Sequence, residues 1–146
     1  MNYTLRKVRP DDIDWLYQLN RESFFDVVVR QFGNWDEAFQ RHMFFSKWEQ
    51  PRPAHIIQIG GHRAGVVILE QLEECNWLHE IQICPGYQGQ GLGATLMHEL
   101  LANARSRSVP LRLQVLHANQ RAKRLYERLG FLEIRRLENH YLMEAC

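Results

Sequence analysis

The stretch Gln88-Gly89-Gln90-Gly91-Leu92-Gly93 decides how the rest of the chain is interpreted. A short apolar run at 81–83 and a Pro85-Gly86 turn come before it, and a helical pattern over 94–104 follows directly. A strand, a glycine-rich loop and a helix in this order can bind an anion. Glycines let backbone N–H groups approach a phosphate closely, and the helix N-terminus adds about half a positive charge. The loop therefore predicts a phosphate-bearing ligand.

The composition predicts a single globular domain over residues 1–146. The chain is 45% hydrophobic and 24% charged, as soluble globular proteins are. Its formal net charge of +1 creates no overall field that would favour nucleic acid or an anionic membrane surface. No apolar run reaches the ~18 residues of a membrane span, and residues 1–6 lack the apolar core of a signal peptide. We therefore expect neither nucleic acid nor a membrane as a partner.

The cysteines indicate a reducing compartment. Cys75, Cys84 and Cys146 lie far apart in the sequence and form no CxxC pair. This odd count argues against a disulfide framework and against a cysteine zinc site, so we expect no metal. A cytoplasmic location is the natural expectation.

Hydrophobic periodicity and turn residues predict the order β-α-α-β-β-β-α-β-α-β-β. Strands are expected at 3–8, 55–59, 64–71, 77–83, 111–116, 131–137 and 141–143. Helices are expected to begin at Pro10, near Asn34 as an N-cap, at Ala94 and after Asn119. The stretch 24–32 fits either a helix or a strand. The order predicts an α/β fold with a mixed, mostly antiparallel central sheet flanked by helices.

The segment 89–94 also matches the GxGxx(G/A) fingerprint of dinucleotide-binding folds. That fingerprint requires a carboxylate about 20 residues further on, which binds the ribose. The corresponding stretch, 110–114, reads Pro-Leu-Arg-Leu-Gln and contains no acid. The strands before the loop also look like a hairpin rather than a parallel crossover unit. A P-loop is excluded because no GxxxxGK[ST] motif is present.

Two motifs in the right order make the chain similar to the GNAT superfamily of N-acetyltransferases. The segment 81–93, Ile-Gln-Ile-Cys-Pro-Gly-Tyr-Gln-Gly-Gln-Gly-Leu-Gly, resembles the family's central Gln-x-x-Gly-x-Gly motif. Further along, 113–119 and 125–131 resemble its second motif. The resemblance implies that two neighbouring parallel strands, here 77–83 and 111–116, splay apart and seat acyl-coenzyme A in the gap.

The resemblance implies acetyl-CoA as the cofactor and assigns its contacts. The backbone of 81–83 would pair with the pantetheine arm as an added strand does, and the amides of 89–93 would hold the pyrophosphate. Gln88 would brace the loop or contact phosphate. Lys123 would lie near the adenosine phosphates, or simply belong to a solvated helix face. The expected cofactor contacts are Ile81, Gln82, Ile83, Gln88, Gly89, Gln90, Gly91, Leu92, Gly93, Ala94, Asn119, Lys123 and Tyr126.

The same resemblance suggests two catalytic residues. Tyr126 would protonate the leaving thiolate as a general acid, although an aromatic packed on the helix's apolar stripe is the alternative. Some relatives carry a glutamate base on the second splayed strand, where this chain has Gln114. Glu80 on the first splayed strand is the natural substitute, unless that strand face is simply solvent-exposed. His79 and His117 are the fallback bases.

The resemblance implies acetyl transfer to a primary amine by direct attack in a ternary complex. A small-molecule amine, a protein N-terminus or a lysine all fit as acceptor. Asp26, Asp36 and Glu37 could attract a cationic amine, although the last two also suit a helix first turn. The loss of the usual glutamate at Gln114 keeps a second hypothesis open, a non-catalytic acyl-CoA-binding regulatory module. A homodimer is expected from the resemblance alone.

Overall fold

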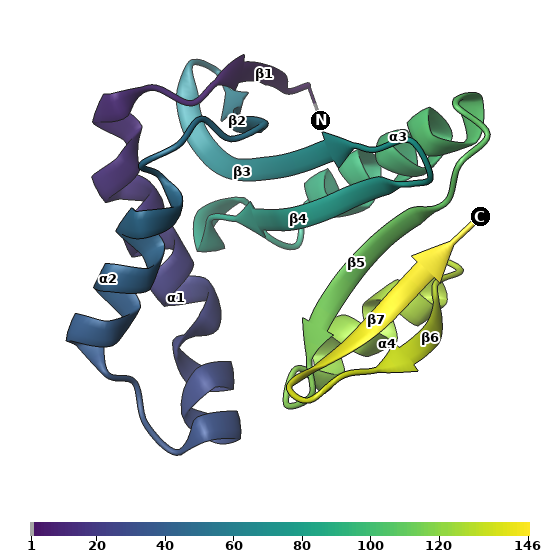
Figure 1. Ribbon diagram of the computed structural model, residues 1–146. Helices are drawn as coiled ribbons and strands as arrows, with labels where there is room; N and C mark the ends of the chain where they lie inside the picture. The colour runs from purple at the N-terminus through teal and green to yellow at the C-terminus, as the bar shows by residue number, and fades with distance from the viewer. Residues whose placement is uncertain (1) are drawn as a thin grey trace.

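A seven-stranded sheet forms the centre of the computed structural model, which describes residues 2–146 (Figure 1). Its strand order is β1-β2-β3-β4-β5-β7-β6. The strands are β1 Thr4–Lys7, β2 Ala54–Ile59, β3 His62–Gln71, β4 Asn76–Ile83, β5 Leu111–Leu116, β6 Leu132–Arg136 and β7 His140–Ala145. All neighbouring strands pair antiparallel except β4 and β5, which are parallel. The predicted fold class is confirmed.

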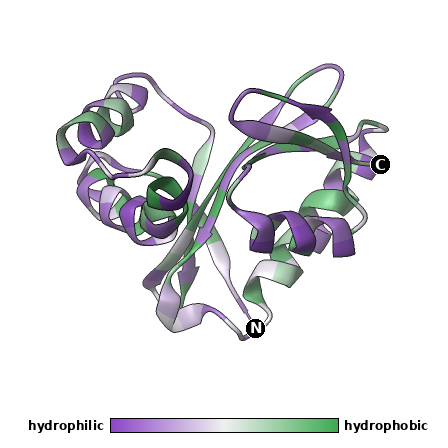
Figure 2. Ribbon diagram, turned by 90° about the horizontal axis from the view of Figure 1, so that it is seen from below, coloured by the Kyte–Doolittle hydropathy of each residue, from purple (hydrophilic) through white to green (hydrophobic). Residues whose placement is uncertain are grey.

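Helices cover both faces of this sheet (Figure 2). Within residues 2–146 they are α1 Ile13–Phe32, α2 Glu37–Lys47, α3 Leu92–Ser106 and α4 Gln120–Arg128, with short 3-10 turns at Pro10–Asp12 and Pro85–Tyr87. One core lies under α1 and α2, where Leu16 and Leu19 pack on Ile56 and Val66. The other lies under α3 and α4. No helix in the described range has the length and apolar character of a membrane span.

Local capping explains where the helices begin and end. Asn34 is not the N-cap of α2; the prediction is wrong, because the Asp36 carboxylate accepts the Phe39 N–H at 3.0 Å and adds a charge that suits the helix dipole. The ambiguous stretch 24–32 is helical and ends at Gly33, which has a φ of 91°. Asn119 caps α4 as expected, accepting the Ala122 N–H at 3.2 Å.

The pair β4–β5 is joined at one end only. Its parallel pairing covers Asn76 with Leu111 and Trp77 with Arg112, and stops there. Asn76 is fully buried, its N–H donates to the Pro110 carbonyl at 2.9 Å, and its side-chain amide donates to Asn103 at 2.9 Å. These bonds tie the base of the pair together. Beyond them the strands diverge, as the resemblance implied.

A bulge in β4 sets which way its side chains face. Ile68 of β3 lies opposite Glu80, whereas the next residue of β3, Leu69, lies opposite Leu78, so His79 is an extra residue. Leu78 and Ile81 contact the core under α3 and α4. Glu80 lines a pocket beside α1 and α2 instead. A bulge re-aims side chains in this manner because it interrupts the two-residue alternation.

Gly65 lets β3 and β4 approach each other at this point. It lies opposite Ile83, and a Cβ placed on it would meet the Gln82 carbonyl oxygen at 2.2 Å and Ile57 Cδ1 at 3.2 Å. The first contact is with backbone, which cannot move aside as a flexible side chain can.

We expect Gly65→Ala to lower the free energy of unfolding by about 1–3 kcal/mol, because β4 must shift to make room. Urea unfolding followed by far-UV circular dichroism measures the change. Gly86→Ala is the matched control, since a Cβ there meets nothing within 4 Å and the residue does not have a positive φ. Equal stability of Gly65→Ala and wild type would refute the close-packing argument.

Candidate functional site

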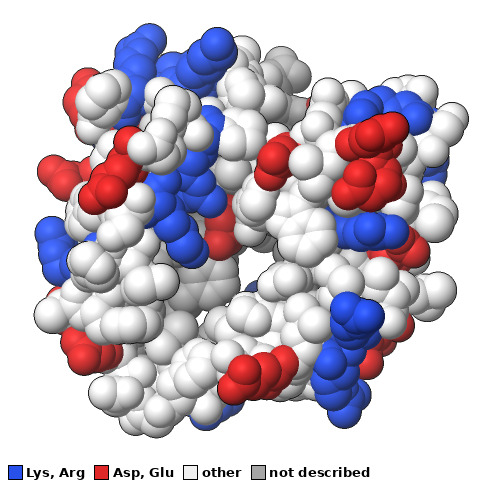
Figure 3. Space-filling view, in the orientation of Figure 1, with Lys and Arg blue, Asp and Glu red and all other residues white. Residues whose placement is uncertain are grey.

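The divergence of β4 and β5 opens a cleft of about 600 Å³. Its walls come from α1, α2, β4, β5 and the start and middle of α4. Figure 3 shows the hollow near the centre of this face, between the α1–α2 side of the molecule and the β5–β7 side. The strands expected to splay are therefore the ones that form the cleft.

The free edge of β4 forms one wall. Residues 78–83 have no hydrogen-bonded partner on β5, although all of them line the cleft. Ile81 and Ile83 anchor their side chains in the core under α3 and leave this backbone at the opening. An extended, amide-containing chain fits such an edge, because it completes hydrogen bonds that a missing strand would make. The expected contacts Ile81, Gln82 and Ile83 are brought together here.

The glycine loop presents unpartnered N–H groups near the same edge. Gly89 and Gly91 have φ angles of 75° and 84°, and Gly91 is the N-cap of α3. Within the described residues, no N–H group from 89 to 94 donates a hydrogen bond to the protein. Leu92 is buried and fixes the helix start to the core. The helix end is thus suited to a pyrophosphate.

Side chains hold the loop in shape. Gln88 Nε2 donates to the Ile83 carbonyl at 2.8 Å, and Gln90 Nε2 donates to the Gly86 carbonyl at 3.2 Å. Of the two roles expected for Gln88, the structure therefore shows the bracing one. The bond from Gln88 therefore holds the loop against the end of β4.

The predicted residues of α4 separate into two groups. Asn119 and Tyr126 line the cleft, together with Ala122. Lys123 does not: its ammonium group pairs with Glu133 at 3.0 Å and lies 4.2 Å from the ring centre of Tyr141. Lys123 therefore contacts β6 and β7 and does not lie at the cleft.

Tyr126 combines a packed ring with a hydroxyl at the cleft. Its ring meets Phe131 edge-on at 5.5 Å, and Phe131 belongs to the core. Its hydroxyl has no hydrogen bond to the described part of the chain. Burial, and next the negative charge of Glu80, raise the pKa of Tyr126 to about 12. Tyr126 is thus a protonated phenol under the influence of the Glu80 charge.

Glu80 is a partly buried carboxylate on the bulged strand. Gln82 Nε2 donates to Glu80 Oε2 and to Asn20 Oδ1, both at 3.2 Å, and so orients the carboxylate. Burial raises the Glu80 pKa above its ordinary value, against the opposing effects of the Gln82 hydrogen bond and the positive charges of Lys47 and Arg52. A carboxyl group with a raised pKa is a stronger base than a solvated one.

The other candidate bases are less well placed. Gln114 lines the opposite wall from β5 but cannot accept a proton as a carboxylate does. His79 lines the cleft while its Nε2 contacts Glu70 at 2.9 Å. His117 does not line it, and its Nε2 is buried without a partner among the described residues.

The acids expected near the acceptor are mostly used elsewhere. Asp36 caps α2, and Glu37 accepts the Tyr17 hydroxyl at 3.0 Å and pairs with Arg21 at 3.3 Å. Asp26 is exposed on α1 and lines neither of the pockets around Glu80. These carboxylates therefore do not form an acidic acceptor site.

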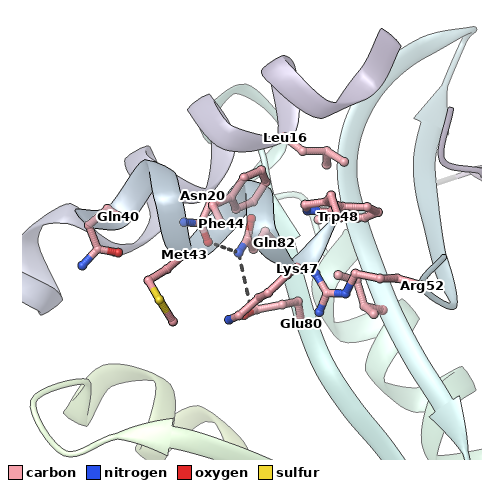
Figure 4. A pocket seen from close by; sticks show the side chains of 12 residues that line it. Leu16, Asn20, Gln40, Met43, Phe44, Lys47, Trp48, Arg52, Glu80 and Gln82 are labelled. Carbon is pink, nitrogen blue, oxygen red and sulfur yellow. Dashed lines mark hydrogen bonds between the residues drawn. The ribbon is translucent and has the colours of Figure 1, made fainter. Parts of the chain in front are cut away.

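Sequence reasoning missed a small chamber behind Glu80. Its volume is about 80 Å³, and α1, α2, β3 and β4 surround it (Figure 4). Lys47, Trp48 and Arg52 contribute to its lining and lie in the segment from the end of α2 to the start of β2. No motif in the sequence marks them, because only the packing of α2 across the sheet brings them to Glu80.

Known proteins resemble this chain over most of its length. The sequence model of the acetyltransferase (GNAT) family matches residues 14–131. A putative ribosomal protein bS18-alanine N-acetyltransferase of Bacillus subtilis is 26% identical over 129 residues, which cover 86% of this chain and 78% of that protein. The uncharacterized N-acetyltransferase MJ1207 of Methanocaldococcus jannaschii is 25% identical over 150 residues, covering 90% of this chain but only 61% of its own length.

A solved structure shows the same fold. The PaiA N-acetyltransferase from Thermoplasma acidophilum, crystallised in complex with coenzyme A, superposes with a TM-score of 0.75 over 99% of both chains. Its sequence identity to this chain is 18%, so the likeness is one of fold.

We expect Glu80→Gln to raise the free energy of unfolding near neutral pH, because burial makes the ionised Glu80 costly in the folded state. The raised pKa means that wild-type stability rises as pH falls through the folded pKa, and the extra cost vanishes below the ordinary value of 4.5. The advantage of the variant should therefore shrink with acid. Urea unfolding between pH 4.5 and about pH 8 measures it.

Glu73→Gln is the control for this experiment, because Glu73 is exposed in the turn between β3 and β4. A Glu80→Gln protein that is less stable than wild type near neutral pH would contradict the desolvation argument.

Proposed function

The chain belongs to the acetyltransferase (GNAT) family, and from that premise we propose that it transfers an acetyl group from acetyl-CoA to a primary amine by direct attack. In this proposal Glu80 is the general base and Tyr126 the general acid. The observation that carries it is the placement of both groups in one cleft, whose free strand edge and unpartnered loop N–H groups suit coenzyme A.

The chain's own residues bind and orient the cofactor. The N–H groups of 89–94 hold the pyrophosphate at the start of α3, while Gln88 keeps this loop aligned with β4. The backbone of 81–83 pairs with the amides of the pantetheine arm. Bound acetyl-CoA supplies an activated thioester as the acyl donor. Since coenzyme A needs no side-chain nucleophile for this chemistry, Cys84 remains a structural residue.

Glu80 prepares the acceptor. An alkyl ammonium group has an ordinary pKa of about 10, so it must lose a proton before it can attack. Burial raises the pKa of Glu80 and brings its basicity closer to what proton removal needs at neutral pH. The hydrogen bond from Gln82 orients the carboxylate. Because β5 carries Gln114, whose amide cannot act as a carboxylate base, the base in this proposal is on β4.

Tyr126 supplies the proton to the departing sulfur. Its pKa of about 12 keeps the phenol protonated, and part of that rise comes from the negative charge of Glu80. Once Glu80 has taken a proton that charge is gone, so the phenol becomes a better acid within the same turnover. Protonation of the base thus lowers the pKa of the acid and favours the second proton transfer.

A protein N-terminus and a small amine both remain acceptors in this proposal. The Bacillus subtilis relative, whose name describes an alanine N-acetyltransferase of a ribosomal protein, supports the first. The free thiols of Cys75, Cys84 and Cys146 agree with a cytoplasmic location. A homodimer stays a prediction.

Incubation with acetyl-CoA and a panel of primary amines, with detection of released thiol, tests the proposal. Wild type should release thiol with at least one amine, and Glu80→Gln should lower kcat/KM by about 100-fold to 10,000-fold. Calorimetric binding of coenzyme A without turnover across the panel would favour a non-catalytic acyl-CoA-binding module instead. Failure to bind coenzyme A at all would overturn the proposal.

We expect Tyr126→Phe to reduce kcat by about 100-fold or more while leaving the coenzyme A affinity close to that of wild type. The ring can still pack on Phe131, so only the proton donor is lost. Tyr141→Phe is the control, because Tyr141 is on β7 and does not line the cleft. Full activity of Tyr126→Phe across the pH range would remove the general-acid assignment.

A further inference from the structure

The chamber behind Glu80 opens into the main cleft. Glu80, Gln82, Asn20, Lys47 and Arg52 line both spaces, so the carboxylate of Glu80 lies at their junction. Figure 4 shows the side chains of Lys47, Arg52 and Glu80 around the chamber, with Trp48 above Glu80 in this view. An acceptor amine held at Glu80 would thus have the rest of its molecule within reach of the chamber.

Three residues that line the chamber carry side-chain hydrogen-bond donors without acceptors in the described part of the chain. The side chains of Lys47 and Arg52 form no ion pair and no hydrogen bond in the described part of the chain. The indole N–H of Trp48 is buried and likewise has no partner there. Arg52 stacks on Trp48, with its guanidinium carbon 4.9 Å from the ring centre. Burial lowers the pKa of Arg52, and the charge of Glu80 offsets only part of that effect.

The charge balance of this chamber favours an anion. Two cations face a single carboxylate, and Glu80 already accepts a hydrogen bond from Gln82. Lys47 is exposed and Arg52 is half-buried, so both cations are free to pair with a ligand. A carboxylate that accepts from charged donors forms strong hydrogen bonds. The same cations repel a polyamine. The volume of about 80 Å³ equals that of roughly two to three waters at ~30 Å³ each, which suits a carboxylate.

We propose that the chamber binds a carboxylate of the acceptor, so that the substrate is a primary amine with a carboxylate a few bonds away. This inference rests on the proposed acetyl transfer and narrows its acceptor. A free amino acid offers this chemistry, and so does a peptide whose first residue is Asp or Glu. In either case Lys47 and Arg52 hold the carboxylate while Glu80 faces the amine.

Matched acceptor pairs test the inference. The first pair is β-alanine and β-alaninamide. The second pair is a peptide that starts with Asp and the same peptide starting with Asn. Putrescine is included as a cationic amine. Wild type should prefer the carboxylate member of at least one pair by about tenfold or more in kcat/KM. The first pair reports a free amino acid as the source, and the second reports an acidic peptide.

Variants assign the preference to the chamber. Lys47→Gln and Arg52→Gln should lose about tenfold or more with the carboxylate acceptor and much less with its amide. Lys47→Glu should shift the preference toward putrescine. Arg41→Gln is the matched control, since Arg41 is also on α2 but stacks on Tyr17 and lines neither space. Thermal unfolding of each variant verifies that it folds.

Equal kcat/KM for both members of every pair would overturn the inference. So would equal losses with both members in Lys47→Gln, because the lysine would then act through Glu80 rather than on the acceptor. Calorimetry with N-acetyl-β-alanine and coenzyme A gives a reading that does not need turnover. Weakened binding in Lys47→Gln supports the chamber even if acetyl transfer fails, whereas unchanged binding refutes the chamber even if transfer succeeds.

Discussion

The site depends on the point where β4 and β5 stop pairing. Asn76 and Trp77 meet Leu111 and Arg112, and no later residue of β4 has a partner on β5. The buried Asn76 ties this end to Pro110 and Asn103, which holds the strands together where they meet. A sheet that stayed paired would fill the cleft and satisfy the free edge of β4. The cleft therefore exists because one parallel pairing is kept short.

The bulge at His79 determines that Glu80 lies at the pocket rather than in the core. Without the extra residue, Glu80 would share the face of Leu78 and point into the apolar core under α3 and α4. With it, Glu80 lies beside α1 and α2, where Gln82 and Asn20 form a hydrogen-bonded chain with it. A register change of one residue thus separates the anchoring side chains of β4 from the carboxylate that we propose as the base.

Local signals made the conformation of the glycine loop and the start of α4 predictable from the sequence. The glycines at 89 and 91 adopt positive φ angles and Asn119 caps α4, as their residue types indicate. The acceptor side was not predictable in the same way. The bulge depends on the pairing with β3, and the chamber depends on how α2 packs across the sheet. Even the start of α2 was misplaced at Asn34, since Asp36 competes for the same role.

Glu80 lies between the cleft and the chamber, so the residues and ligands of both spaces influence the pKa of its carboxyl group. Burial raises the pKa of Glu80, while the Gln82 hydrogen bond and the charges of Lys47 and Arg52 lower it, so its basicity reflects a balance of these effects. If the chamber binds a carboxylate as proposed, that anion offsets the two cations, and the pKa of Glu80 rises further when the correct acceptor is in place. The base would then be strongest in the complex that needs it. A cationic acceptor would act in the opposite direction, which links the choice of substrate to the rate of proton removal.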